Sequence, residues 1–108
     1  MEKVAFISGA NRGIGFETSK KLGETGAKVI LGSRDQNKGK EAAKELVSLG
    51  IDAESIQYDA FDPEAPSKVF EYIRKKYDVL DILINNAGVL LTGNLFVTNS
   101  SSVSDKDI

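Results

Sequence analysis

The sequence predicts an α/β protein built on a doubly wound parallel sheet, in a single domain that spans residues 1–108. Four short segments are predicted as strands, at residues 3–8, 27–33, 53–59 and 80–85, and the first, second and fourth are rich in apolar residues. Segments with helical apolar spacing separate them, and glycines follow the first one directly. Strands that are apolar throughout are typical of a parallel sheet covered by helices on both faces. Right-handed crossovers then predict the strand order 3-2-1-4.

Two predicted helices flank the second strand. The first begins at Gly13 and closes at residues 23–26, with Ile14 and Leu22 among its apolar positions. The second covers residues 35–50 and ends in a glycine suited to a C-cap. Five apolar side chains are expected on its inner face: Ala42, Ala43, Leu46, Val47 and Leu49.

The third helix is predicted to open at Asp62, as an N-cap before Pro63, and to continue to about Tyr77. Pro66 removes one early hydrogen bond, so the helix can begin later than Pro63. The inner face of this helix is expected to carry Val69, Phe70 and Ile73.

Composition excludes several functions. The chain has no cysteine and no histidine, so disulfides, thiol nucleophiles and the usual transition-metal ligands are not expected. A net charge of -2 gives no electrostatic reason to expect a nucleic acid or an anionic membrane as partner. No apolar run is long enough to span a bilayer, and the first residues do not resemble a signal peptide. We therefore expect a soluble, cytoplasmic protein.

The stretch SGANRGIG, residues 8–15, predicts a phosphate-binding loop because it lies between a buried strand and a helix. Gly9 permits a sharp turn, Gly13 allows the backbone to approach a pyrophosphate, and Gly15 lets the helix pack close to the sheet. The N-terminus of that helix would direct N–H groups at the anion. The alternative is a glycine-rich turn that serves backbone geometry alone.

The end of the second strand indicates which dinucleotide is bound. An acid there usually contacts the ribose 2′-hydroxyl of NAD, but this chain has Ser33 and Arg34, with Arg12 in the glycine loop. A hydroxyl and two guanidinium groups suit a 2′-phosphate, which favours NADP(H) over NAD(H). Two alternatives stay open: the arginines are only surface charges, or Asp35 bonds the 2′-hydroxyl of NAD.

SGANRGIG, YDAFD at residues 58–62 and NNAG at residues 85–88 together resemble the short-chain dehydrogenase/reductase family, whose fold is of the Rossmann type. The resemblance covers residues 3–88 and implies hydride transfer between a nicotinamide and a small carbonyl or alcohol substrate. It also implies a set of cofactor-binding residues: Gly9, Asn11, Arg12, Gly13, Ile14, Gly15, Ser33, Arg34, Asp59, Ala60, Asn86, Ala87 and Gly88.

Within this set the resemblance implies distinct roles. The loop residues Asn11 to Ile14 would surround the phosphates, and Asp59 would hydrogen-bond the adenine with Ala60 beside it. The NNAG residues would line the ribose and nicotinamide side of the cleft. For Asn85 and Asn86 a purely structural role, joining strand ends, stays an alternative.

The resemblance places the family's catalytic Ser, Tyr and Lys after NNAG, so no catalytic residue is expected in this chain. Tyr72 and Lys76 match the family's Tyr-x-x-x-Lys spacing, but they precede NNAG and are expected on a helix away from the carboxyl ends of the strands. Ser104 opens a helix-start pattern near the end of the sequence, which indicates a truncated chain.

An open fourth strand would then favour self-association or a partner that completes the sheet. The sequence therefore predicts the dinucleotide-binding half of an NADP(H)-dependent oxidoreductase, inactive alone. The alternatives are a non-enzymatic dinucleotide-binding module that acts through a partner chain, and a structural or vestigial product.

Overall fold

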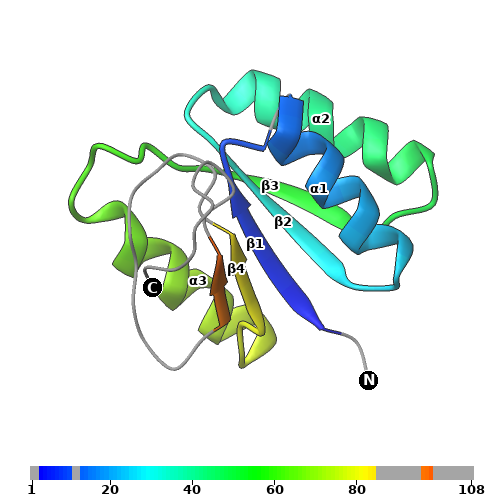
Figure 1. The fold of residues 1–108 in the computed structure, drawn as a ribbon. Coiled ribbons are helices and arrows are strands. Elements are labelled where there is room, and N and C mark those ends of the chain that lie inside the picture. Colours follow the sequence, from blue (N-terminus) through cyan, green and yellow to red (C-terminus); the bar gives the residue numbers. More distant parts are fainter. Residues whose placement is uncertain (1–2, 11–12, 85–95, 99–108) are drawn as a thin grey trace.

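A computed structural model describes residues 3–10, 13–84 and 96–98 of the chain. Five parallel strands form one sheet in the order β3-β2-β1-β4-β5 (Figure 1). The predicted order of the first four strands is confirmed. The strands are β1 (Val4–Ser8), β2 (Lys28–Ser33), β3 (Ala53–Gln57), β4 (Ile82–Ile84) and β5 (Phe96–Thr98).

The fifth strand was not predicted. β5 pairs in parallel with β4, with Phe96 opposite Ile82 and Thr98 opposite Ile84. The expected open edge at the fourth strand is therefore wrong, because β5 takes its hydrogen bonds. An aromatic residue followed by two β-branched residues suits a strand, but a run of three is too short to produce a periodic signal.

Helices cover both faces of the sheet. α1 (Gly13–Glu24) and α2 (Gln36–Ser48) lie on one face, and α3 (Ala65–Tyr77) lies on the other (Figure 1). Successive residues of β1 enter different cores: Ile7 packs with the cluster under α2, and Phe6 packs with the cluster under α3. This alternation is the period of two of a β-strand. Both residues are fully buried, so β1 is the centre of the fold.

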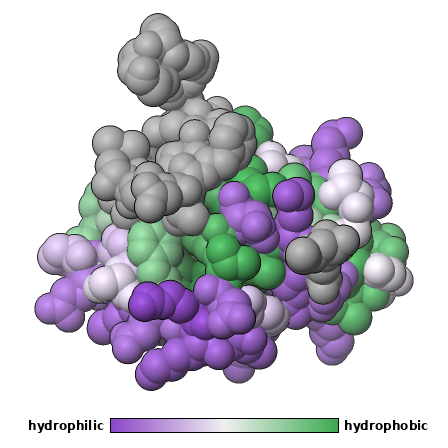
Figure 2. Space-filling model, turned by 90° about the horizontal axis from the view of Figure 1, so that it is seen from below, coloured by the Kyte–Doolittle hydropathy of each residue, from purple (hydrophilic) through white to green (hydrophobic). Residues whose placement is uncertain are grey.

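Hydrophobic residues also reach the surface. Seen from below, the molecule shows an area of hydrophobic residues bordered by hydrophilic ones (Figure 2).

At the end of α2, Val47 and Leu49 are 54% and 55% exposed, so the predicted inner face of the second helix is wrong at these two positions. The sheet instead packs against a face of α2 made mostly of small side chains. Its buried residues are Gly39, Ala42, Ala43 and Leu46.

The third helix begins later than Pro63, at Ala65, with Pro66 in its first turn. The prediction that Asp62 is its N-cap is wrong. Asp62 instead closes a turn before the helix, where its Oδ1 accepts a hydrogen bond from the N–H of Glu64 at 3.0 Å. Proline has no N–H group that needs an acceptor, so this first turn has one donor fewer to satisfy and forms without a side-chain cap.

A polar cluster around Glu54 joins α3 to the outer strands. The Glu54 carboxylate accepts hydrogen bonds from the Tyr77 hydroxyl and, at 2.7 Å, from the Tyr72 hydroxyl. Lys76 Nζ lies 3.4 Å from both oxygens, and Lys28 Nζ lies 3.9 Å from Oε2. Burial alone would raise the pKa of Glu54, but these hydrogen bonds and positive charges lower it below its ordinary value.

A lowered pKa means that Glu54 stabilises the fold above its unfolded pKa, and that this contribution is lost as the pH falls through the folded value. We expect Glu54→Gln to reduce the free energy of unfolding by about 1 kcal/mol at neutral pH. The difference from the unaltered protein should shrink below about pH 4.5. Urea denaturation between neutral and acidic pH measures it. Glu71→Gln, in the exposed pair with Lys75, is the control and should change little at any pH. A Glu54→Gln difference that persists in acid would contradict this account.

Candidate cofactor site

Those predicted site residues that the structure describes lie at or just beyond the carboxyl ends of β1, β2 and β3. Ser8 is opposite Gly32 and Ser33 is opposite Gln57 in the parallel register. The residues that follow these strands therefore lie along one edge of the sheet, where ligands bind in open α/β folds. This edge includes Gly9, Arg34 and Asp59.

Two glycines of the predicted phosphate-binding loop lie in an unusual backbone region. Gly9 and Gly13 have φ values of 62° and 64°, in the left-handed region that favours glycine. The N–H of Ala10 donates to the carbonyl of Gly32 at 3.2 Å, which ties the loop to β2. α1 begins at Gly13 with no acidic residue in its first turn, so its positive end is not neutralised from within. Asn11 and Arg12 lie outside the described residues.

The next two loop residues differ in exposure. Gly15 is buried, and its carbonyl accepts a hydrogen bond from the Ser19 hydroxyl at 2.8 Å. Ile14, in the first turn of α1, is 65% exposed. Its side chain is thus on the surface at the carboxyl edge, and does not belong to the inner face of the helix.

At the end of β2, the three residues Ser33 to Asp35 have different surroundings. Ser33 is 1% exposed, and its hydroxyl donates to the carbonyl of Asp35 at 2.8 Å. The Asp35 carboxylate is the N-cap of α2 and accepts from the N–H groups of Asn37 and Lys38 at 3.0 and 3.1 Å. Arg34 is exposed. Sequence reasoning missed the capping role, although an Asp directly before a helical pattern is its usual signal.

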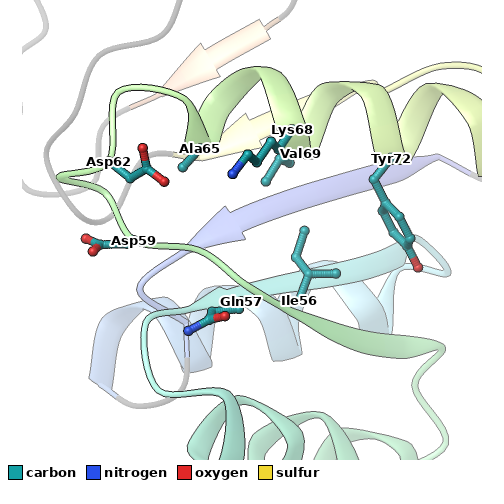
Figure 3. Close-up of a pocket in the computed structure, with 8 residues that line it drawn as sticks. All are labelled: Ile56, Gln57, Asp59, Asp62, Ala65, Lys68, Val69 and Tyr72. Atoms are coloured by element: carbon teal, nitrogen blue, oxygen red, sulfur yellow. The ribbon is translucent and has the colours of Figure 1, made fainter.

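Asp59 lies at one end of a cleft of about 440 Å³ between β3 and α3 (Figure 3). Figure 3 places Asp62 at the same end and Tyr72 at the other. The Oδ1 atom of Asp59 accepts from the N–H of Phe61 at 3.0 Å. Phe61 is 81% exposed, and Ala60 packs partly buried against the core under α3.

The structure does not bring every predicted residue together. Asn85, Asn86, Ala87 and Gly88 lie outside the described residues. Tyr72 and Lys76 are in contact, with 3.2 Å between Lys76 Nζ and the Tyr72 hydroxyl, but both bond Glu54 in the first half of β3. Within the described part of the chain, no group of three or more acidic side chains could hold a metal ion. No helix in that part is long and apolar enough to cross a bilayer.

The sheet order and the helices on both faces define an α/β protein of the Rossmann type. The short chain dehydrogenase family model matches residues 3–108. The chain therefore belongs to the short-chain dehydrogenase family, as its three motifs predict.

Known proteins agree with this assignment. The (+)-neomenthol dehydrogenase of Arabidopsis thaliana is 42% identical over 91 residues, which cover 81% of this chain and 31% of that protein. The structure of menthone neomenthol reductase from Mentha piperita matches with a TM-score of 0.76 and 41% identity, over 82% of this chain and 32% of that one. A metagenomic short-chain oxidoreductase in complex with NADP matches with a TM-score of 0.75 and 38% identity, over 81% and 39%. The chain thus spans about a third of the length of these relatives.

The close contact between α2 and the end of β2 can be tested at Gly39. A Cβ at this position would lie 2.8 Å from the Cβ of Ser33, closer than such atoms approach. We expect Gly39→Ala to lower the free energy of unfolding by about 1 to 3 kcal/mol, since the buried Ser33 has no room to shift. Thermal unfolding measures the effect. Lys40→Ala, at the exposed next position, is the control, and an equal stability of the two variants would contradict the contact.

Proposed function

We propose that the chain is the dinucleotide-binding half of an NADP(H)-dependent short-chain oxidoreductase. The complete enzyme would transfer hydride between the nicotinamide and a small carbonyl or alcohol substrate. The observation that carries the proposal is the exposed Arg34 at the end of β2, on the same sheet edge as the Gly9–Gly13 loop. Membership of the family supports the reaction class.

The described residues fit such a cofactor. The two glycines in the left-handed region open the backbone where a pyrophosphate would lie, and a Cβ at Gly13 would meet no described atom within 4 Å. The first turn of α1 would direct its N–H groups at the phosphates. Asn11 and Arg12 would join them, Ile14 would cover the loop side, and Asp59 with Ala60 would hold the adenine. Asn86, Ala87 and Gly88 would line the nicotinamide side.

The preference for NADP(H) over NAD(H) follows from the charges at the end of β2. Arg34 offers a guanidinium that can bind a 2′-phosphate bidentately. Asp35 follows it, but its carboxylate caps α2 and bonds two amides there. The buried Ser33 hydroxyl donates to a backbone carbonyl, which leaves Arg34 as the main reader of the phosphate. One related structure contains NADP, which is consistent with this preference.

When bound, the nicotinamide would donate or accept the hydride. The residues of this chain would position the cofactor, and the chain alone would be inactive. Its partners are then the dinucleotide and, in the complete enzyme, the carbonyl or alcohol substrate. A cytoplasmic location, and self-association or a completing partner at the outer edge of β5 rather than of β4, belong to the same proposal. No feature of the described residues favours a non-enzymatic module.

Arg34→Asp tests the cofactor preference. Replacing the guanidinium by a carboxylate should weaken NADPH binding by about tenfold or more, because a charge-assisted hydrogen bond becomes a repulsion. NADH binding should change by less than about threefold, since it carries no 2′-phosphate. Titrations that follow the fluorescence of each reduced dinucleotide measure both. Arg74→Asp on α3 makes the same charge change away from the site and should leave both affinities unaltered. Equal losses of NADPH and NADH binding in the Arg34→Asp protein would show that Arg34 does not read the phosphate.

The purified 108-residue chain should not oxidise NADPH in the presence of carbonyl compounds. The only Tyr-x-x-x-Lys pair of the sequence, Tyr72 and Lys76, bonds Glu54, toward the opposite edge of the sheet from the glycine loop. The absorbance of NADPH, followed with and without a panel of aldehydes and ketones, measures this. Carbonyl-dependent oxidation would refute the prediction, and its loss in Tyr72→Phe would make that tyrosine catalytic.

A further inference from the structure

The backbone on both sides of Arg34 is held by hydrogen bonds, while the Arg34 side chain is exposed. Its guanidinium makes no hydrogen bond or ion pair with any residue that the structure describes. Its neighbours are fixed from three directions. The Ser33 carbonyl accepts from the N–H of Tyr58 at 2.9 Å, and Gln57 Nε2 lies 3.4 Å from the Arg34 carbonyl. The Asp35 carboxylate binds the start of α2.

Asp35 provides the most specific of these restraints. Its Oδ1 atom accepts from the N–H groups of Asn37 and Lys38, and its carbonyl accepts from both the Ser33 hydroxyl and the N–H of Gly39. One residue thus ends the strand segment and begins the helix. Its negative charge lies against the positive end of α2, which offsets its repulsion of an anion nearby.

We infer that Asp35 is a positioning residue for the recognition of a 2′-phosphate, acting through Arg34. An acid after β2 would oppose a 2′-phosphate if its charge faced the ligand. In this chain the cap orients the carboxylate toward α2 and fixes the backbone from which Arg34 extends. An arginine whose backbone is already fixed loses less backbone freedom on binding than one in a mobile loop. The ligand class is adenosine phosphates with a phosphate on the 2′-oxygen, and the inference rests on the proposed function.

The test compares 2′,5′-ADP with 5′-AMP as probes of the full 108-residue chain, using ligand-detected NMR to obtain both dissociation constants. Asp35→Ala removes the cap, and the preference for 2′,5′-ADP should fall by about fivefold or more. Asp35→Asn removes the same charge but keeps an oxygen that caps the helix. Its preference should stay within about twofold of the unaltered chain, or rise.

Lys44→Gly is the matched control for helix stability. It weakens α2 at an exposed position in the middle of the helix, far from Arg34. If the role of Asp35 is merely structural, each of the two variants, Asp35→Ala and Lys44→Gly, should lower the affinity for 2′,5′-ADP and for 5′-AMP by the same factor. Gln57→Ala, which removes the second restraint on Arg34, should reduce the preference by about twofold, in keeping with its longer hydrogen bond. If Asp35→Ala does not fold, Asp35→Gly removes the same capping side chain at a smaller cost to the helix and should lose the preference likewise.

The outcomes separate the inference from the proposed function. No preference of the unaltered chain for 2′,5′-ADP would overturn the proposed cofactor and this inference with it. A clear preference that Asp35→Ala and Gln57→Ala both retain would overturn only the inference. A preference lost in Asp35→Ala and kept in Asp35→Asn and Lys44→Gly is the expected result.

Discussion

β1 is hydrogen-bonded on both sides, in parallel with β2 and with β4, and its side chains enter both cores of the protein. The helix that follows β1 covers one face of the sheet, while the chain reaches β4 from a helix on the other face. Connections therefore diverge at the carboxyl end of β1, which leaves that end accessible between them. The glycine loop lies at this point, and the other site residues take their places relative to it through the strand register.

Close packing in the core fixes the backbone from which the surface residues of the candidate site extend. A Cβ at Gly32 would lie 2.6 Å from the ring of the buried Phe6, and Gly39 brings α2 against Ser33 in the same way. Protein interiors packed this tightly are hardly compressible, so the elements around them keep fixed relative positions. Arg34 extends from a strand end that is fixed by its neighbours on both β3 and α2. A binding residue can in this way remain exposed and without a described partner while its backbone is firmly held.

The two ends of β3 have separate tasks. Toward its amino end, Glu54 joins the strand to the last turns of α3 through two tyrosines and a lysine. Beyond its carboxyl end, Asp59 belongs to the candidate cofactor site. α3 runs along the cleft, with Asp59 at one end of the cleft and Tyr72, which bonds Glu54, at the other (Figure 3). The Tyr-x-x-x-Lys spacing of Tyr72 and Lys76 follows from helix geometry alone, because residues four apart on a helix meet on one face, whatever that face contacts.

The sequence by itself determined the order of the first four strands, the glycine loop and the family, because buried parallel strands, left-handed glycines and their spacing are local patterns. It also indicated that Tyr72 lies away from the carboxyl ends of the strands, where the candidate cofactor site is. Only the tertiary structure decided that Val47 and Leu49 face solvent and that β5 extends the sheet. These depend on which side of a helix packs against the sheet and on pairing with another strand. Such features are fixed by packing between segments, which no single stretch of residues specifies.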